Sequence, residues 1–180
     1  GFKTNRVSGY FEPIEPTKAD QLVLPKNFKY DVIAAFDDVI NPAGEKFGSG
    51  CDYNAFFPIK GSNVRGLLVN NHEYSTIFSI GPVKDGKMSA DQIHKNLYYQ
   101  GMSVIEVYRD EKGVWKMDTT STHARRINGF TKFDITGPAK GIPALKGATT
   151  ATGTFANCSG GVTLWNTVLS CEENFEETAA

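Results

Sequence analysis

NCSGGVTLWNTVLSCEENF, the stretch at residues 157–175, determines how the rest of this sequence is interpreted. Short apolar and β-branched runs, separated by glycine or polar residues, are typical of strands joined by tight turns. We predict that residues 153–156 and 166–171 form a strand pair, with Ser159-Gly160-Gly161 as the turn between them. The two glycines have no Cβ, and so another segment of backbone can approach them closely.

Five side chains with oxygen or sulfur donor atoms lie at the ends of these predicted strands. They are Asn157, Cys158, Glu172, Glu173 and Asn174. Carboxylate and amide oxygens are hard ligands that suit Ca²⁺, whereas a thiolate beside carboxylates suits a transition metal such as iron. The group therefore suits a site for mixed metals. The same pattern also fits a plain hairpin whose cysteines are buried or paired with each other and whose acids are solvated.

Further strands are expected along the chain before this stretch. The candidates are residues 28–36, 53–59, 66–70, 102–108 and 114–117. One short helix is expected at residues 90–99, because Ser89 and Gln92 have the spacing of a capping box. Many short strands with one brief helix predict an all-β protein built from antiparallel sheets.

The chain is divided into an arm and a domain by its composition. Residues 1–25 contain three prolines and are interpreted as an extended N-terminal arm. Residues 137–153 are rich in glycine, proline, alanine and threonine and are interpreted as a loop. The all-β domain is therefore expected to occupy residues 26–180.

The composition fits a globular domain without a strong electrostatic field. The chain has 180 residues, 40% of them hydrophobic, and a formal net charge of −1 at pH 7. This balance argues against the basic surface of a nucleic-acid-binding protein. No apolar stretch reaches the roughly 18 to 20 residues that cross a bilayer, and the first residues lack the apolar core of a signal peptide. Three cysteines are too few for a disulfide scaffold and leave at least one thiol unpaired.

Residues 157–175 resemble the signature of the PhoX family of bacterial alkaline phosphatases. The similarity lies in the order and spacing of NC, GG, T, W and CEENF. Two further elements are similar to segments of that family, namely NNHE at residues 70–73 and RRING at residues 125–129. One departure is Leu164-Trp165-Asn166, where family members often have Pro-Trp-Gly. The resemblance extends from about residue 22 to the end of the chain.

This resemblance implies a particular architecture. Members of the family are six-bladed β-propellers, and this chain would form the N-terminal blades with one short helix inserted. At roughly 40 to 50 residues per blade, the chain has room for about two or three blades. The resemblance therefore implies that a C-terminal part of the same propeller completes the protein. It also implies a mature periplasmic or extracellular protein, secreted with a signal that this chain does not contain.

The resemblance also implies a metal-dependent phosphomonoesterase. Such an enzyme uses Ca²⁺ and Fe³⁺ to hydrolyse small phosphate esters through a metal-activated oxygen nucleophile. The metal-binding residues would be Cys158 for iron and, for calcium or as bridges, Glu73, Asn71 and either Glu172 or Glu173. The residues assigned to catalysis would be Asn157 and Asn174, as donors to a phosphate oxygen, and Arg126. Further ligands, including an arginine that clamps the phosphate, would lie beyond residue 180.

Several alternatives stay open at this point. A non-catalytic, calcium-stabilised β-propeller that binds a partner or acts as a scaffold would also need Ca²⁺. The same fold could instead hydrolyse another kind of ester. His72 and Arg126 could make structural hydrogen bonds or ion pairs and not touch a metal or substrate. Strand alternation places Glu172 and Glu173 on opposite faces, but a bulge would reverse which of them points inward.

Overall fold

The computed structural model describes residues 11–174. The chain forms two compact units, Gly1–Asp31 and Val32–Ala180. Residues 11–31 of the first unit contain no helix or strand, and within them the rings of Phe11 and Phe28 form an edge-to-face contact with centroids 5.3 Å apart. The elements that form the candidate site all belong to the second unit.

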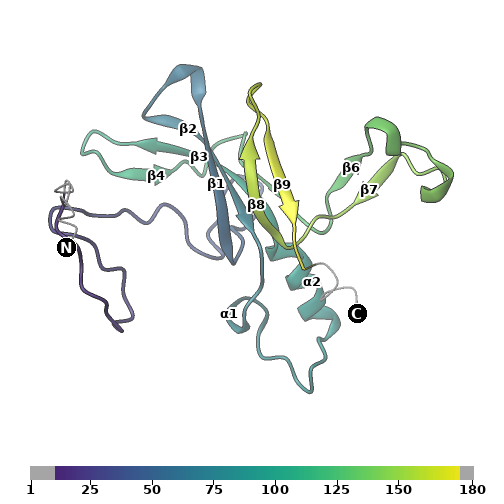
Figure 1. Cartoon of the computed structure of the whole chain (residues 1–180), viewed down its shortest axis with the longest axis horizontal. Helices are drawn as coiled ribbons and strands as arrows, with labels where there is room; N and C mark the ends of the chain where they lie inside the picture. Colours follow the sequence, from purple (N-terminus) through teal and green to yellow (C-terminus); the bar gives the residue numbers. More distant parts are fainter. Residues whose placement is uncertain (1–10, 175–180) are drawn as a thin grey trace, which may run out of the picture. The chain divides into compact units, whose positions relative to one another are not determined.

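A five-stranded antiparallel sheet is the largest element of the second unit (Figure 1). Its strands are β1 (Cys51–Pro58), β2 (Arg65–His72), β3 (Gly101–Arg109), β4 (Trp115–Met117) and β5 (Arg125–Ile127). The first four are paired in chain order, and β5 pairs with β3. The tight turn between β3 and β4 uses Gly113, whose positive φ of 82° favours glycine.

Apolar side chains are buried on both faces of this sheet. Val104 of β3 belongs to one buried cluster, together with Val69, whereas its neighbour Ile105 belongs to another, together with Phe47. Successive residues of a strand point to opposite faces, so neighbours on β3 join different clusters. Because both of its faces are covered, β3 is apolar along most of its length rather than alternating.

Two helices and two hairpins complete the described part of the second unit. The helices are α1 (Ile77–Ile80) and α2 (Ala90–Tyr99), and short 3-10 turns lie at Ile59–Gly61, Gly137–Ala139 and Pro143–Leu145. The hairpins are β6 (Lys132–Asp134) with β7 (Thr150–Thr152), and β8 (Asn157–Val162) with β9 (Val168–Glu172). β8 contacts β1 and β2, so the second hairpin lies against the main sheet (Figure 1). Within residues 11–174, no helix has the length and apolar character needed to cross a bilayer.

The sequence predicted β1 to β4, β9 and α2, whereas β5, β6 and α1 were not expected. The strands expected at 53–59, 66–70, 102–108 and 114–117 are confirmed as β1 to β4, with somewhat different ends. The expected helix is confirmed as α2, and its capping box is formed: Gln92 N donates to Ser89 Oγ over 3.3 Å, and Ser89 N donates to Gln92 Oε1 over 3.0 Å. The chain is thus mostly β with few helices, although strand pairing alone does not reveal propeller blades.

The strand expected at residues 28–36 is wrong. That segment is irregular, because backbone pairing in this region starts only at Asp37, whose N–H donates to Phe47 O over 3.1 Å. The segment interpreted as a loop at residues 137–153 is partly wrong as well, since it contains β7. In both cases the local composition gave no information about the partner strand, which decides whether a strand forms.

The turn expected at Ser159-Gly160-Gly161 is also wrong. These residues lie inside β8, which starts at Asn157, and the turn lies between β8 and β9. There, Thr163 N donates to Thr167 O over 2.9 Å. Gly160 instead allows close packing, because a Cβ on it would lie 2.5 Å from Tyr53 Cδ1 of β1.

Candidate metal centre

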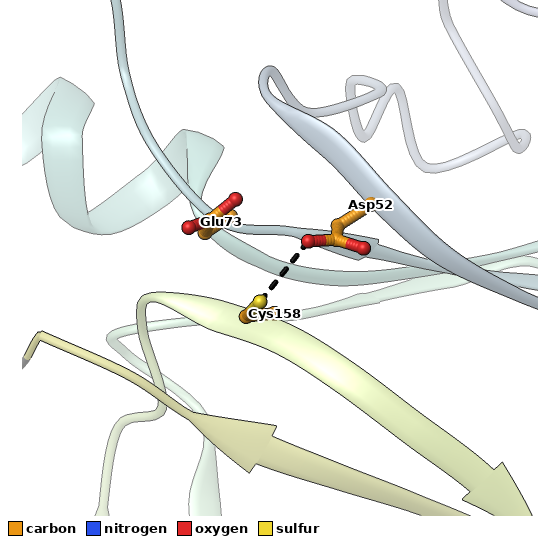
Figure 2. Close-up of side chains that lie close together, drawn as sticks. All are labelled: Asp52, Glu73 and Cys158. Atoms are coloured by element: carbon orange, nitrogen blue, oxygen red, sulfur yellow. Dashed lines mark hydrogen bonds between the residues drawn. The ribbon is translucent and has the colours of Figure 1, made fainter.

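Three side chains with metal-binding atoms converge where β8 meets the main sheet. Carboxylate oxygens of Asp52 and Glu73 and the Sγ of Cys158 all lie within 4.8 Å of one another. Figure 2 shows the three side chains close together, with the Cys158 thiol donating a hydrogen bond to Asp52 Oδ2 over 3.1 Å. Asp52 is on β1, Glu73 follows β2, and Cys158 is on β8. The cluster therefore depends on tertiary contacts among three strands.

Asp52 and Cys158 each lie in an irregularity of strand pairing. The pairs that flank these irregularities are Cys51 with His72 and Asn54 with Asn70 for β1, and Asn157 with Glu172 and Gly160 with Ser170 for β8. In each case two residues, the first being Asp52 or Cys158, face one residue of the partner strand. Such a bulge interrupts the alternation of side chains and changes their direction. Both bulges contribute a donor atom to the same site.

Acidic groups are concentrated at this site. Hydrogen bonds from the thiol to the carboxylates of Glu173 and Asp52 raise the pKa of Cys158 to about 12. Burial, and then the nearby carboxylates of Asp52 and Glu173, raise the pKa of Glu73. Among the ion pairs of residues 11–174, none joins a lysine or arginine to these acids. A bound cation would relieve this repulsion, and a thiol beside carboxylates fits iron together with calcium.

The two predicted glutamates at the end of β9 have different surroundings. Glu173 interacts with Cys158 and Glu73, as the pKa shifts of those residues show. Glu172 accepts a hydrogen bond through Oε1 from Phe155 N over 3.3 Å. Of the pair, Glu173 is the residue that the structure places beside the cluster.

The three predicted asparagines differ in exposure. Asn71 and Asn157 are buried, at 0% and 1% exposure, and their side chains are hydrogen-bonded within the fold. Asn71 Nδ2 donates to Cys158 O over 2.8 Å, and Asn157 Nδ2 donates to Ser170 Oγ over 2.9 Å. Asn174 is exposed and has a positive φ of 52°. Only Asn174 among the three is therefore open to solvent.

Arg126 lies in a buried network with Ser103 and His72. Its Nη1 donates to Ser103 Oγ over 2.6 Å and its Nη2 to Gln100 O over 2.7 Å. Ser103 Oγ also lies 2.7 Å from His72 Nε2. Because the Ser49 carbonyl can only accept, His72 Nδ1 carries the ring proton and donates to Ser49 O over 3.2 Å. The pKa of His72 is lowered to about 3, chiefly by burial, so the ring is neutral and its Nε2 accepts from the Ser103 hydroxyl. The network joins the end of β2 to the segment that precedes β1.

Sequence reasoning missed Asp52. A signal was present, because antiparallel pairing of residues 53–59 with 66–70 places residue 52 beside the segment that contains Glu73. The local sequence around Asp52 has no metal-binding motif, and only the strand pairing shows that it belongs to the site. Cys158, Glu73 and Glu173 were among the predicted metal ligands and are brought together here.

Fold and site together define a mostly antiparallel β protein with a mixed thiol and carboxylate cluster suited to binding cations. The family model described as "Alkaline phosphatase PhoX" matches residues 9–180, which is nearly the whole sequence. The chain therefore belongs to the PhoX alkaline phosphatase family. A search of curated proteins gives no match.

A solved structure supports this assignment. The fold is similar to that of Pseudomonas fluorescens PhoX in complex with vanadate, a transition state analogue. The two chains are 32% identical, and the TM-score is 0.81. The match covers 92% of this chain and 32% of the Pseudomonas chain. This chain thus spans about a third of the length of that relative.

Proposed function

We propose that this chain is part of a metal-dependent phosphomonoesterase that hydrolyses small phosphate esters. The observation that carries this proposal is the convergence of Asp52, Glu73 and Cys158 in a chain of the PhoX family. The solved structure of the Pseudomonas relative is a complex with vanadate, a transition state analogue. A similar fold in this chain supports the same class of chemistry at phosphorus.

The donor set suggests which residue holds which metal. The soft thiolate of Cys158 would hold iron, and the carboxylates of Asp52, Glu73 and Glu173 would hold calcium or bridge two ions. When bound, the metals supply positive charge that offsets the charge of the phosphate, and they activate an oxygen nucleophile.

The residues of this chain hold the metal-binding atoms in place and accept the proton that the Cys158 thiol releases. Cys158 must lose its proton before it binds a metal, and the carboxylate of Asp52, which accepts the thiol hydrogen bond over 3.1 Å, would receive that proton. Asn174 is exposed beside Glu173, and we propose that it donates to a phosphate oxygen. Asn157 and Arg126, with their buried hydrogen bonds, contribute by holding the backbone around the site.

We also propose that a further segment completes both the site and a β-propeller. This chain covers 32% of the Pseudomonas chain, so most of a PhoX-length protein has no counterpart in it. That segment would supply the remaining ligands and an arginine that clamps the phosphate. A periplasmic or extracellular location of the mature protein belongs to the same proposal.

A non-catalytic, calcium-stabilised module is the second candidate. The carboxylates of Asp52 and Glu73 could bind Ca²⁺ without any chemistry. The thiol favours the phosphatase, because Ca²⁺ takes oxygen ligands and gains nothing from sulfur. Cys158 among the donors therefore argues for a second, softer metal.

The test combines metal content with hydrolysis of p-nitrophenyl phosphate by the protein at its natural length. Cys158→Ala is expected to lose iron and to lower kcat by more than about 100-fold. Cys171→Ala is a matched control, because it removes an exposed thiol from the neighbouring strand β9. Full activity of Cys158→Ala, or equal losses in both variants, contradicts the proposal. Calcium without iron, and no hydrolysis by the unmodified protein, would favour the calcium-stabilised module.

A further inference from the structure

We infer that Asn71 is a positioning residue of the metal centre, which fixes the bulge that presents Cys158 and does not itself bind a metal. The inference deepens the proposed function and rests on it. Asn71 is fully buried at the end of β2, between the β1 bulge that carries Asp52 and the β8 bulge that carries Cys158. One side chain thus lies between two of the three donor residues.

All polar atoms of the Asn71 carboxamide have partners. Nδ2 donates to Cys158 O over 2.8 Å and to Ser159 O over 3.1 Å. Oδ1 accepts from Ser170 Oγ over 3.0 Å. The opposite orientation of the amide would point its oxygen at two carbonyl oxygens, so these contacts allow a single orientation. The Asn71 oxygen is therefore directed to β9 and not to the metal-binding atoms.

The β8 bulge needs a donor of this kind. Cys158 and Ser159 face one residue of β9, and a bulge leaves the extra residue outside the regular ladder. The carbonyl oxygens of these two residues accept the hydrogen bonds from Asn71 Nδ2. Because the same bulge turns the Cys158 side chain toward Asp52, the Asn71 amide fixes where the sulfur lies.

Asn71 also lies next to the backbone segments that carry the carboxylates of Asp52 and Glu73. Asn71 is the β2 residue that faces the β1 bulge formed by Asp52 and Tyr53. Glu73 follows two residues later, and its N–H donates to Gly50 O over 2.8 Å, which ties it to the start of β1. Loss of the Asn71 side chain should therefore change the relative placement of sulfur and carboxylates while leaving every donor in place.

The experiment compares Asn71→Ala and Asn71→Asp with Asn128→Ala. Asn128 is a matched control, because it is also a buried asparagine, and its Nδ2 donates to a backbone carbonyl, Tyr98 O. Binding of Cd²⁺ is followed by the thiolate-to-metal absorption in protein of natural length carrying C51S and C171S, so that the signal reports on Cys158. Asn71→Ala is expected to weaken Cd²⁺ binding by about 10- to 100-fold. Asn128→Ala should leave it unchanged.

Asn71→Asp separates positioning from ligation. An aspartate has the same shape and is a better metal ligand, but it cannot donate to Cys158 O and Ser159 O. Positioning predicts that Asn71→Asp binds Cd²⁺ and Ca²⁺ at least as weakly as Asn71→Ala. A second readout needs no metal, since amide hydrogen exchange at Ser159 and Gly160 should accelerate in Asn71→Ala and not in Asn128→Ala.

Three results would overturn the inference. They are tighter metal binding by Asn71→Asp than by the unmodified protein, equal affinities of Asn71→Ala and Asn128→Ala, and unchanged exchange of the bulge amides. If Asn71→Ala does not fold, Ser170→Ala removes only the hydroxyl that orients the carboxamide, and unchanged Cd²⁺ affinity in that variant would also overturn it. Failure of the unmodified protein to bind any metal would instead refute the proposed metal centre, and the positioning role with it.

Discussion

Gly160→Ala tests whether β8 must pack against β1 without a side chain. A Cβ on Gly160 would lie 2.5 Å from Tyr53 Cδ1 and 2.8 Å from the carbonyl oxygen of Leu169. Leu169 pairs across the hairpin next to this position, so its oxygen can move only if the hairpin backbone moves. Tyr53 follows Asp52 in the β1 bulge, which limits relief on that side. Overpacking of this kind costs about 1–3 kcal/mol, and we expect Gly160→Ala to lower the free energy of unfolding by about 2 kcal/mol.

Gly161→Ala provides the control in the same strand. Nothing lies within 4 Å of a Cβ built on Gly161, and its φ is not positive. Its replacement should leave the free energy of unfolding unchanged or raise it by about 0.5 kcal/mol, through reduced freedom of the unfolded chain. Urea unfolding followed by circular dichroism measures both variants, with equal m-values required for the comparison. Equal effects of the two substitutions would refute the packing argument, as would a loss below about 0.5 kcal/mol for Gly160→Ala.

Two further predictions concern protons. Burial, and then the charge of Arg126, lower the pKa of His72 to about 3, so between that value and 6.5 the unfolded chain binds one proton more than the folded chain. The free energy of unfolding should therefore rise with pH across this window, by up to about 1.4 kcal/mol per pH unit. His72→Gln should flatten that slope in urea titrations at several pH values. An unchanged slope in the variant would contradict the lowered pKa of His72. Since the pKa of Cys158 is raised to about 12, Cd²⁺ binding to the metal-free protein at mildly alkaline pH should release about one proton per ion, detected with an indicator dye in weak buffer. Cd²⁺ binding without proton release would show that Cys158 is not a ligand.

Four strands of the main sheet could be predicted because their signals are local, whereas the three-residue strand β5 was not expected. The apolar run of β3 and the capping box of α2 are visible without knowledge of any partner. The β8–β9 hairpin shows the limit of this approach, because a Ser-Gly-Gly segment is a turn signal by composition. Gly160 serves instead to let Tyr53 pack against β8, and no local pattern separates a glycine needed for a turn from one needed for packing.

The candidate site was predictable only in part for a related reason. Cys158, Glu73 and Glu173 carry chemistry that can be identified from residue type, and family resemblance drew attention to them. Asp52 joins them through the pairing of β1 with β2, and its direction depends on a bulge. The choice between Glu172 and Glu173 also depends on backbone geometry where β9 ends, which alternation along an isolated strand does not determine.

The end of β2 shows how one short motif divides support from ligation. Asn71, His72 and Glu73 look like three candidate ligands in the sequence, but successive residues of a strand face opposite sides. Asn71 contacts the β8 bulge, whereas His72 points to the Ser103 network and is fully buried. Glu73 returns to the side of Asn71, where it is partly exposed and lies beside the cluster. Substitutions at the first two positions should therefore act on the metal centre through geometry, whereas those at Glu73 remove a donor atom directly.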